Sequence, residues 1–133
     1  MEERVRLEIV TPERLLFSED VDEVIAPGHL GEFGVLPEHT PFITLLDIGI
    51  LKYRQGEREK QVAVSGGFAE VLENKVLILA RTAEFAEEID VDRAKRALER
   101  AEKSIENLPL DDEAYVKFEA KLRRAMVRIQ ASE

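Results

Sequence analysis

The chain has 133 residues, of which 44% are hydrophobic and 35% charged, and its formal net charge is −9. This composition suits one folded domain, or a small domain with an appendage, and excludes an intrinsically disordered chain. The absence of cysteine excludes disulfides, zinc thiolates and thiol catalysis, and the acidic balance argues against nucleic acid as a partner.

The first part of the chain, residues 1–88, is patterned as short β-strands. Val5, Leu7 and Ile9 alternate with Arg6 and Glu8, which is the period of a half-buried strand. The opening residues, MEERVRLEIV, carry charges where an export signal would be apolar, so we expect none and favour a reducing, cytoplasmic compartment. The most apolar segment, FITLLDIGIL, is far shorter than the ~20 residues that cross a bilayer.

Further strand-like segments follow at 21–26, 49–54, 60–71 and 75–81. Turn signals at Gln55-Gly56 and at 73–75 separate them, and Gly66-Gly67 inside the third segment indicates a bulge or a sharp bend. Short strands at regular spacing, with no helical pattern between them, predict an antiparallel sandwich or a flattened barrel.

Residues 28–42, GHLGEFGVLPEHTPF, hold both histidines in a stretch rich in turn residues. His29 and His39 are ten residues apart, which does not fit the close spacing of paired histidine ligands. Each could simply be a hydrogen-bonded loop residue. Alternatively, the glycines of this stretch place Glu32 and His39 at an exposed tip that docks on a partner.

The period changes in residues 89–133, which read as two amphipathic helices. Asp90 is a suitable N-cap, Pro109 interrupts the pattern, and Asp111 or Asp112 caps a second helix. Apolar residues recur at steps of three and four, at Val91, Ala94, Leu98, Ala101, Ile105 and Leu108, and then at Tyr115, Phe118, Leu122, Ala125 and Ile129. This helical hairpin has too little apolar surface to fold alone, so we expect it to pack on the sandwich or on another protein and to be able to exchange partners.

Basic residues of the hairpin are the remaining candidates for a site. Arg93 and Arg100 share one face of the first helix, and Arg124 and Arg128 share one face of the second. If these faces converge, they form a clamp for a phosphate group; otherwise they only solvate the helices. No nucleophile or phosphate-loop motif accompanies them, so nothing in the residues indicates an enzyme.

Three segments together resemble a known family. GHLGEFGVLPEHTPFITLLDIGIL, VSGGFAEVLENKVLILARTAE and EEIDVDRAKRALERA are similar to the epsilon subunits of rotary proton-translocating ATP synthases, called delta in mitochondria. The resemblance implies an N-terminal antiparallel β-sandwich of about ten strands in residues 1–88, followed by a C-terminal antiparallel two-helix hairpin in residues 89–133.

The resemblance also implies a non-catalytic subunit of the central rotor stalk. Its partners would be the gamma subunit and the membrane ring of c subunits, with Glu32 and His39 in the loop that contacts the ring. The protein would be peripheral, held at the cytoplasmic face of the bacterial membrane only through the complex.

In bacterial members of the family the helical hairpin is a switch. When it extends toward the catalytic alpha and beta subunits it blocks ATP hydrolysis, and its basic residues meet an acidic segment of beta. By position, Lys121, Arg123, Arg124 and Arg128 would make this contact. The charge of residues 114–133, five bases against two acids, is consistent with an acidic protein surface or an anionic ligand.

Some members also bind ATP as a regulatory ligand, without any other cofactor. The family pattern Ile/Leu-Asp-x-x-Arg-Ala matches Ile89, Asp90, Arg93 and Ala94, and the further arginines correspond to Arg100, Arg124 and Arg128, with Glu84 near the base. Two other hypotheses remain open from the residues alone: a free-standing ATP-binding regulatory module, and a small metalloenzyme.

Overall fold

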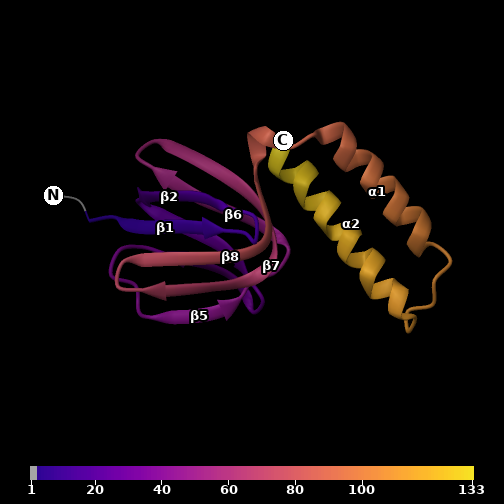
Figure 1. The fold of residues 1–133 in the computed structure, drawn as a ribbon, viewed down its shortest axis with the longest axis horizontal. Helices are drawn as coiled ribbons and strands as arrows, with labels where there is room; N and C mark the ends of the chain where they lie inside the picture. Colours follow the sequence, from indigo (N-terminus) through magenta and orange to yellow (C-terminus); the bar gives the residue numbers. More distant parts are fainter. Residues whose placement is uncertain (1–2) are drawn as a thin grey trace.

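The computed structural model describes residues 3–133 and contains a β-sheet unit followed by two helices (Figure 1). The elements in chain order are β1 (Val5–Val10), β2 (Leu15–Val21), β3 (Glu23–Gly28), β4 (Gly31–Val35), β5 (Phe42–Leu45), β6 (Gly49–Gln55), β7 (Arg58–Leu72), β8 (Lys75–Phe85), the 3₁₀ turn η1 (Ala86–Glu88), α1 (Val91–Ile105) and α2 (Glu113–Ser132). The predicted order of strands before helices is therefore confirmed.

The strands form one hydrogen-bonded sheet that folds over itself like a sandwich. Its order is β2-β1-β8-β7-β6-β3-β4, with β5 paired to β7 beside this path. Every pair is antiparallel except β1 with β8, which is parallel. The described residues contain eight strands, so the expected number of about ten was too high. The number of about ten was implied by the resemblance, whereas the residue pattern itself predicts β7 and β8 as single segments at 60–71 and 75–81.

The hydrophobic core lies inside this sheet and uses residues from the strands and their connections. Val5, Leu7 and Ile9 are fully buried, which confirms the alternation in β1. The other buried members of this core fall between Phe17 and Ala80, so neither helix contributes to it. The sheet unit therefore has a complete core of its own.

A bend at Gly66 and Gly67 lets β7 pair with two different strands, β6 before the bend and β5 after it. The N-terminal half of β7 pairs with β6 as far as Val64, and its C-terminal half pairs with β5 from Phe68 onward. The register between β7 and β8 is unchanged across the bend, so no residue is inserted and the feature is a bend, not a bulge. Gly67 has a φ of +102°, and a Cβ there would lie 1.8 Å from the carbonyl oxygen of Leu79.

The stretch 28–42 is more regular than its turn residues suggest. Gly31–Val35 form β4, which pairs antiparallel with β3, and only residues 36–41 form the loop to β5. Gly31, with a φ of +128°, makes the tight turn between β3 and β4. Sequence reasoning missed this strand because two of its five residues are glycine, which strands usually avoid.

Both helices begin at the predicted caps. The carboxylate of Asp90 accepts a hydrogen bond of 3.1 Å from the Arg93 N–H, and that of Asp112 accepts one of 2.9 Å from the Ala114 N–H. The small residues Ala94, Ala101 and Ala125 are buried along the predicted helix faces. Neither helix, nor any other among residues 3–133, is long and apolar enough to span a membrane.

The hairpin meets the sheet unit through α2, which lies between the sheet and α1 (Figure 1). A small cluster of Ala63 from β7, Ile89 from the connection and Ala131 from α2 forms this joint, with Val127 packed beside it. Because the cluster contains mostly small side chains, little apolar area holds the hairpin in place.

We expect Gly67→Ala to destabilise the sheet unit strongly. The added methyl group would collide with the backbone of Leu79, which cannot rotate away as a side chain would. The free energy of unfolding, measured by urea titration with circular dichroism, should fall by about 3 kcal/mol.

Gly56→Ala is the matched control for this change. Gly56 also has a positive φ, +64°, but a Cβ there would meet nothing within 4 Å. Gly56→Ala should lower the free energy of unfolding only by the cost of a positive φ for alanine, about 1 kcal/mol. Equal losses for the two variants would show that the bend at Gly67 needs no close approach of β7 and β8.

Candidate functional site

A cavity of about 550 Å³ lies where the two helices meet β8, a size within the range of small-molecule sites. Residues from three elements line it: Thr82 and Glu84 from β8, Ala97, Arg100, Ala101 and Ser104 from α1, and Phe118, Lys121, Arg124, Ala125 and Arg128 from α2. The alanines leave space between the helices because their side chains are short. The cavity is therefore a product of helix packing against the end of the sheet.

Cations dominate the polar lining. Arg100, Lys121, Arg124 and Arg128 face one acid, Glu84. The ion pairs recorded within residues 3–133 include only one of these cations, Arg128. An excess of positive charge in a partly enclosed space, with arginine as the main donor, suits a polyanion such as a phosphate chain.

Arg128 is held by Glu84 in a two-point contact. Its Nε donates to Glu84 Oε1 at 2.7 Å, and a terminal nitrogen donates to Oε2 at 3.3 Å. The two side chains are 25% and 35% exposed, so the pair is partly shielded from water. This contact fastens α2 to β8 and fixes Arg128 at the wall of the cavity.

The structure brings four of the eight residues predicted to bind a nucleotide into the lining of this one cavity. Glu84, Arg100, Arg124 and Arg128 all line the cavity, although 44 residues separate the first from the last. Phe118, Ser104 and Thr82 line it too and were not predicted. The position of Phe118 at helical spacing from Lys121 and Ala125 was a usable signal, whereas Thr82 joins the site only because α2 docks on β8.

The other four predicted residues, which form the Ile-Asp-x-x-Arg-Ala motif, do not line this cavity. Ile89 belongs to the joint with Ala63, Asp90 caps α1, Ala94 is fully buried and Arg93 is exposed. In this arrangement the motif stabilises the start of α1, because Asp90 caps the helix and Ile89 and Ala94 are buried.

A second ion pair joins α2 to the sheet unit near the loop before β6. The Arg123 guanidinium donates to Asp47 Oδ1 at 2.9 Å, and the Ile48 N–H donates to the same oxygen at 2.8 Å. Partial burial raises the pKa of Asp47, but the bonds from Ile48 and Arg123, with the nearby charge of His29, outweigh it and hold the pKa below its usual range. Asp47 therefore stays ionised and paired at neutral pH.

The four basic residues assigned to a beta-subunit contact pair with the sheet unit or line the cavity, and two of them, Lys121 and Arg123, are exposed. Arg123 pairs with Asp47, while Lys121, Arg124 and Arg128 line the cavity. Lys121 also lies over the Phe118 ring, with 5.2 Å from Nζ to the ring centroid. Docking of α2 therefore engages Arg123 and Arg128 directly, through Asp47 and Glu84.

Glu32 and His39, the residues predicted for the ring contact, lie on β4 and in the loop after it. Glu32 is exposed and His39 is half-buried. No hydrogen bond or ion pair is recorded between them in the described residues. The apolar side chains around them are unusually open to solvent: Leu30 is 93%, Leu36 54% and Ile43 63% exposed. Such a surface is typical of a protein contact.

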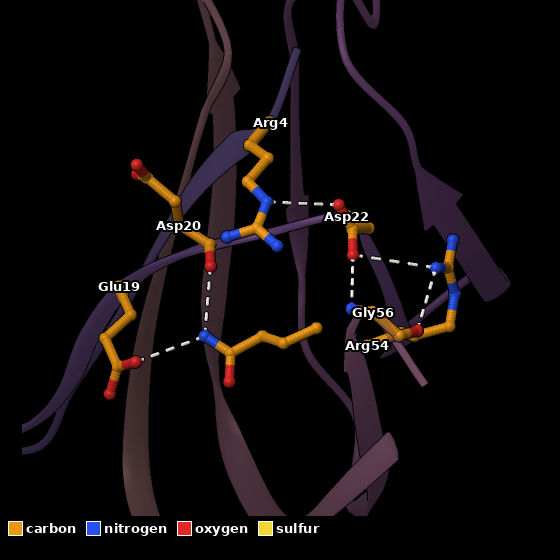
Figure 2. A network of polar contacts seen from close by, with 7 residues as sticks. Arg4, Glu19, Asp20, Asp22, Arg54 and Gly56 are labelled. Carbon is orange, nitrogen blue, oxygen red and sulfur yellow. Dashed lines mark hydrogen bonds and ion pairs between the residues drawn. The ribbon is translucent and has the colours of Figure 1, made fainter. Parts of the chain in front are cut away.

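A polar network at the start of the sheet unit has a structural role (Figure 2). Asp22 accepts from Arg4 at 3.2 Å and from the Gly56 N–H at 2.6 Å, and it also pairs with Arg54. The Gly56 hydrogen bond, followed by the two arginines, lowers the pKa of Asp22 against the opposing effect of burial. The network ties the β6–β7 turn to the chain before β3.

Within residues 3–133, no three acidic or histidine side chains are grouped to hold a metal ion.

Comparison with known proteins gives matches over the whole chain. The model of the ATP synthase delta/epsilon chain β-sandwich domain matches residues 4–86, and that of the long α-helix domain of the same chain matches residues 87–133. An ATP synthase epsilon chain of Syntrophobacter fumaroxidans is 50% identical over 133 residues, covering 100% of this chain and 98% of the relative. The ATP synthase epsilon chain 2 of Syntrophotalea carbinolica is 48% identical, covering 99% and 96%.

Solved structures show the same arrangement. A chain in the mitochondrial ATP synthase of Euglena gracilis, solved as OSCP, F1 and c-ring, superposes with a TM-score of 0.85 at 28% identity, covering 100% of this chain and 84% of that one. A chain from the central stalk and c-ring of the Tetrahymena thermophila mitochondrial enzyme has a TM-score of 0.66 at 18% identity, covering 99% and 98%, and supports the fold alone.

We expect Arg123→Gln to loosen the docking of α2 at neutral pH. The pair is well exposed, so its loss should raise the undocked population by about fivefold at most, equivalent to about 1 kcal/mol. Because the sequence lacks cysteine, dyes attached at Glu57→Cys and Glu106→Cys can report the distance between sheet and hairpin by energy transfer.

The effect should depend on pH with a definite sign. The pKa of Asp47 is lowered in the folded protein, so the pair stabilises docking above about pH 3.9, the ordinary aspartate value, and is lost as the pH falls through the lower folded value. Wild type and Arg123→Gln should therefore converge in acid. Arg123→Lys, which keeps the charge, is the control, and a difference that persists below that range would exclude Asp47 as the partner.

Proposed function

Because the chain belongs to the ATP synthase delta/epsilon family, we propose that it links the gamma subunit to the c-ring and regulates ATP hydrolysis through its C-terminal hairpin. The resemblance inferred from the sequence is confirmed by these matches. The chain is an epsilon-type subunit of the central stalk, a non-catalytic part of the complex. The main observation behind this proposal is that the models of both domains match, together covering nearly all of the chain.

The sheet unit is the part proposed to join the rotor together. Its independent core, the exposed apolar residues near β4 and β5, and the assemblies that contain its structural neighbours support this role. Glu32 and His39 are proposed to meet the c-ring, and the neighbouring apolar surface suits a contact with rotor partners. The protein is then peripheral, at the cytoplasmic face of the bacterial membrane and attached through the complex.

The hairpin is proposed to inhibit hydrolysis when it leaves the sheet unit. Lys121, Arg123, Arg124 and Arg128 would then contact acidic surface on the catalytic subunits. The support is that Arg123 and Arg128 pair with the sheet unit in the docked position, so these two residues serve docking or inhibition, but not both. Because the joint at Ala63 and Ala131 is weak, the free-energy cost of moving the hairpin from the sheet unit to another partner is small.

ATP is proposed as the ligand that holds the docked form, with no other cofactor. The cavity places Arg100, Arg124 and Arg128 around one space, which is what a triphosphate requires. A ligand that binds only the docked hairpin shifts the population toward it, and so relieves inhibition.

A free-standing ATP sensor is the second candidate, since all walls of the cavity come from this one chain. Both candidates predict ATP binding by the isolated protein. Co-purification with gamma from the source cell supports the stalk subunit, and a lone ATP-binding monomer in that cell supports the sensor.

We predict that Arg124→Ala combined with Arg128→Ala weakens both ATP binding and inhibition. Two charge-assisted contacts are lost, so the dissociation constant from isothermal calorimetry should rise by about 100-fold. Inhibition of ATP hydrolysis in the reconstituted complex should weaken as well. Arg96→Ala combined with Lys117→Ala removes two exposed cations outside the cavity and should change the affinity little. Unchanged affinity and unchanged inhibition in the first variant would reject the double role.

The proposed division into residues 1–88 and 89–133 predicts that a chain ending at Ile89 still folds. The sheet unit keeps its whole core, because the hairpin contributes nothing to it. The fragment should unfold cooperatively and bind gamma, as followed by calorimetry and co-elution. A fragment that is unfolded, or folded but unable to bind gamma, would contradict the two-part organisation.

A further inference from the structure

Asn74 connects three segments at the end of the sheet unit where β1 begins. It forms a two-residue turn between β7 and β8 with Glu73, and the two residues have φ values of +62° and +42°. Its backbone carbonyl accepts a hydrogen bond of 2.8 Å from the Arg6 N–H in β1. Its side-chain Oδ1 accepts a second one from the Glu38 N–H in the loop between β4 and β5.

The loop at residues 36–41 depends on that second bond. Its other recorded hydrogen bonds are local: the His39 N–H donates to the Leu36 carbonyl at 3.2 Å, and His39 Nδ1 lies 2.6 Å from the Thr40 carbonyl. Among the described residues, the bond to Asn74 is the one recorded hydrogen bond that ties this loop to a distant segment. The other contacts of the loop are side-chain packing, since Pro37 and His39 are half-buried.

Glu38 needs such a tie because its backbone is in an unfavourable region. Its φ is +68°, the left-handed conformation that residues with a Cβ seldom adopt. A free loop would relax toward ordinary backbone angles. The hydrogen bond to Asn74 fixes the Glu38 amide, and with it the direction in which the chain enters His39.

The position of this loop decides what the surface presents. The His39 ring is 6.3 Å from the Phe42 ring, which in turn is 5.2 Å from the Phe33 ring on β4. Leu36, at the start of the loop, is 54% exposed. A change at Glu38 would therefore move the histidine relative to an aromatic row and an exposed leucine.

We infer that Asn74 is the positioning residue of the ring contact, acting through Glu38 on the loop that carries His39. This inference rests on the proposed contact of Glu32 and His39 with the c-ring. Asparagine suits the position because it tolerates a positive φ and also carries an acceptor on a short side chain. Glycine would satisfy the turn alone, and only the tie to Glu38 requires a side-chain acceptor.

The first test uses two variants of the full chain that keep the turn. Asn74→Gly permits the positive φ but removes the acceptor, whereas Asn74→Asp keeps both. Amide exchange at Glu38, measured by nuclear magnetic resonance, should become about fivefold faster in Asn74→Gly and stay close to wild type in Asn74→Asp. Unchanged exchange in Asn74→Gly would overturn the inference.

The second test measures binding to a rotor of gamma and c-ring from the same cell. If the loop occupies its binding position in a smaller fraction of molecules, the apparent affinity for the rotor falls in proportion to that fraction. We expect a loss of up to about fivefold for Asn74→Gly, and wild-type affinity for Asn74→Asp. Glu73→Gly alters the other residue of the same turn, which has no recorded bond to the loop, and should bind as wild type. Equal losses in Asn74→Gly and Glu73→Gly would assign the effect to the turn and overturn the inference.

Glu32→Gln and His39→Ala separate this inference from the proposed function. If they weaken rotor binding and Asn74→Gly does not, the positioning role fails while the ring contact stands. If none of the three weakens binding, the ring contact itself is wrong and the inference falls with it. Weakening by all three, with rescue by Asn74→Asp, supports both.

Discussion

The attachment of α2 to the sheet unit is the contact on which the site and the proposed regulation depend. It consists of a small apolar cluster around Ala63, Ile89 and Ala131 and of two ion pairs, Asp47 with Arg123 and Glu84 with Arg128. Alanine buries little apolar area, and an exposed ion pair such as Asp47 with Arg123 contributes about 1 kcal/mol or less. The core of the sheet unit is complete without the hairpin, so undocking leaves the remainder of the fold intact.

The cavity follows from the same attachment. Arg128 pairs with Glu84 and also lines the cavity, so the contact that docks α2 also builds one wall of the anion site. A bound polyanion would add contacts to the arginines only while α2 is docked, and its binding free energy would then count toward docking. A weak attachment is what makes such a ligand effective, because an equilibrium near balance responds to a few kcal/mol.

The sheet unit itself is organised for rigidity. At the Gly67 bend, β7 approaches β8 so closely that no side chain fits, and Asn74 ties β1, the β7–β8 turn and the 36–41 loop together. Both features use backbone conformations that most residues avoid. A fixed surface at one end and a loosely held hairpin at the other match the two tasks proposed for this subunit, transmitting torque and responding to nucleotide.

The sequence by itself determined the local structure, the order of strands and helices, the caps at Asp90 and Asp112, and the family. These follow from spacing and residue type within short windows, as in the alternation of Val5, Leu7 and Ile9. Its glycines concealed β4, and the period-two segments covered only five of the eight strands, whereas the resemblance implied about ten. Tertiary structure alone decided that Thr82 and Glu84 join Arg128 in one cavity, and that Asn74 reaches Glu38. Those contacts join residues 36 to 46 positions apart, and their geometry is set by how elements pack, which local sequence patterns do not encode.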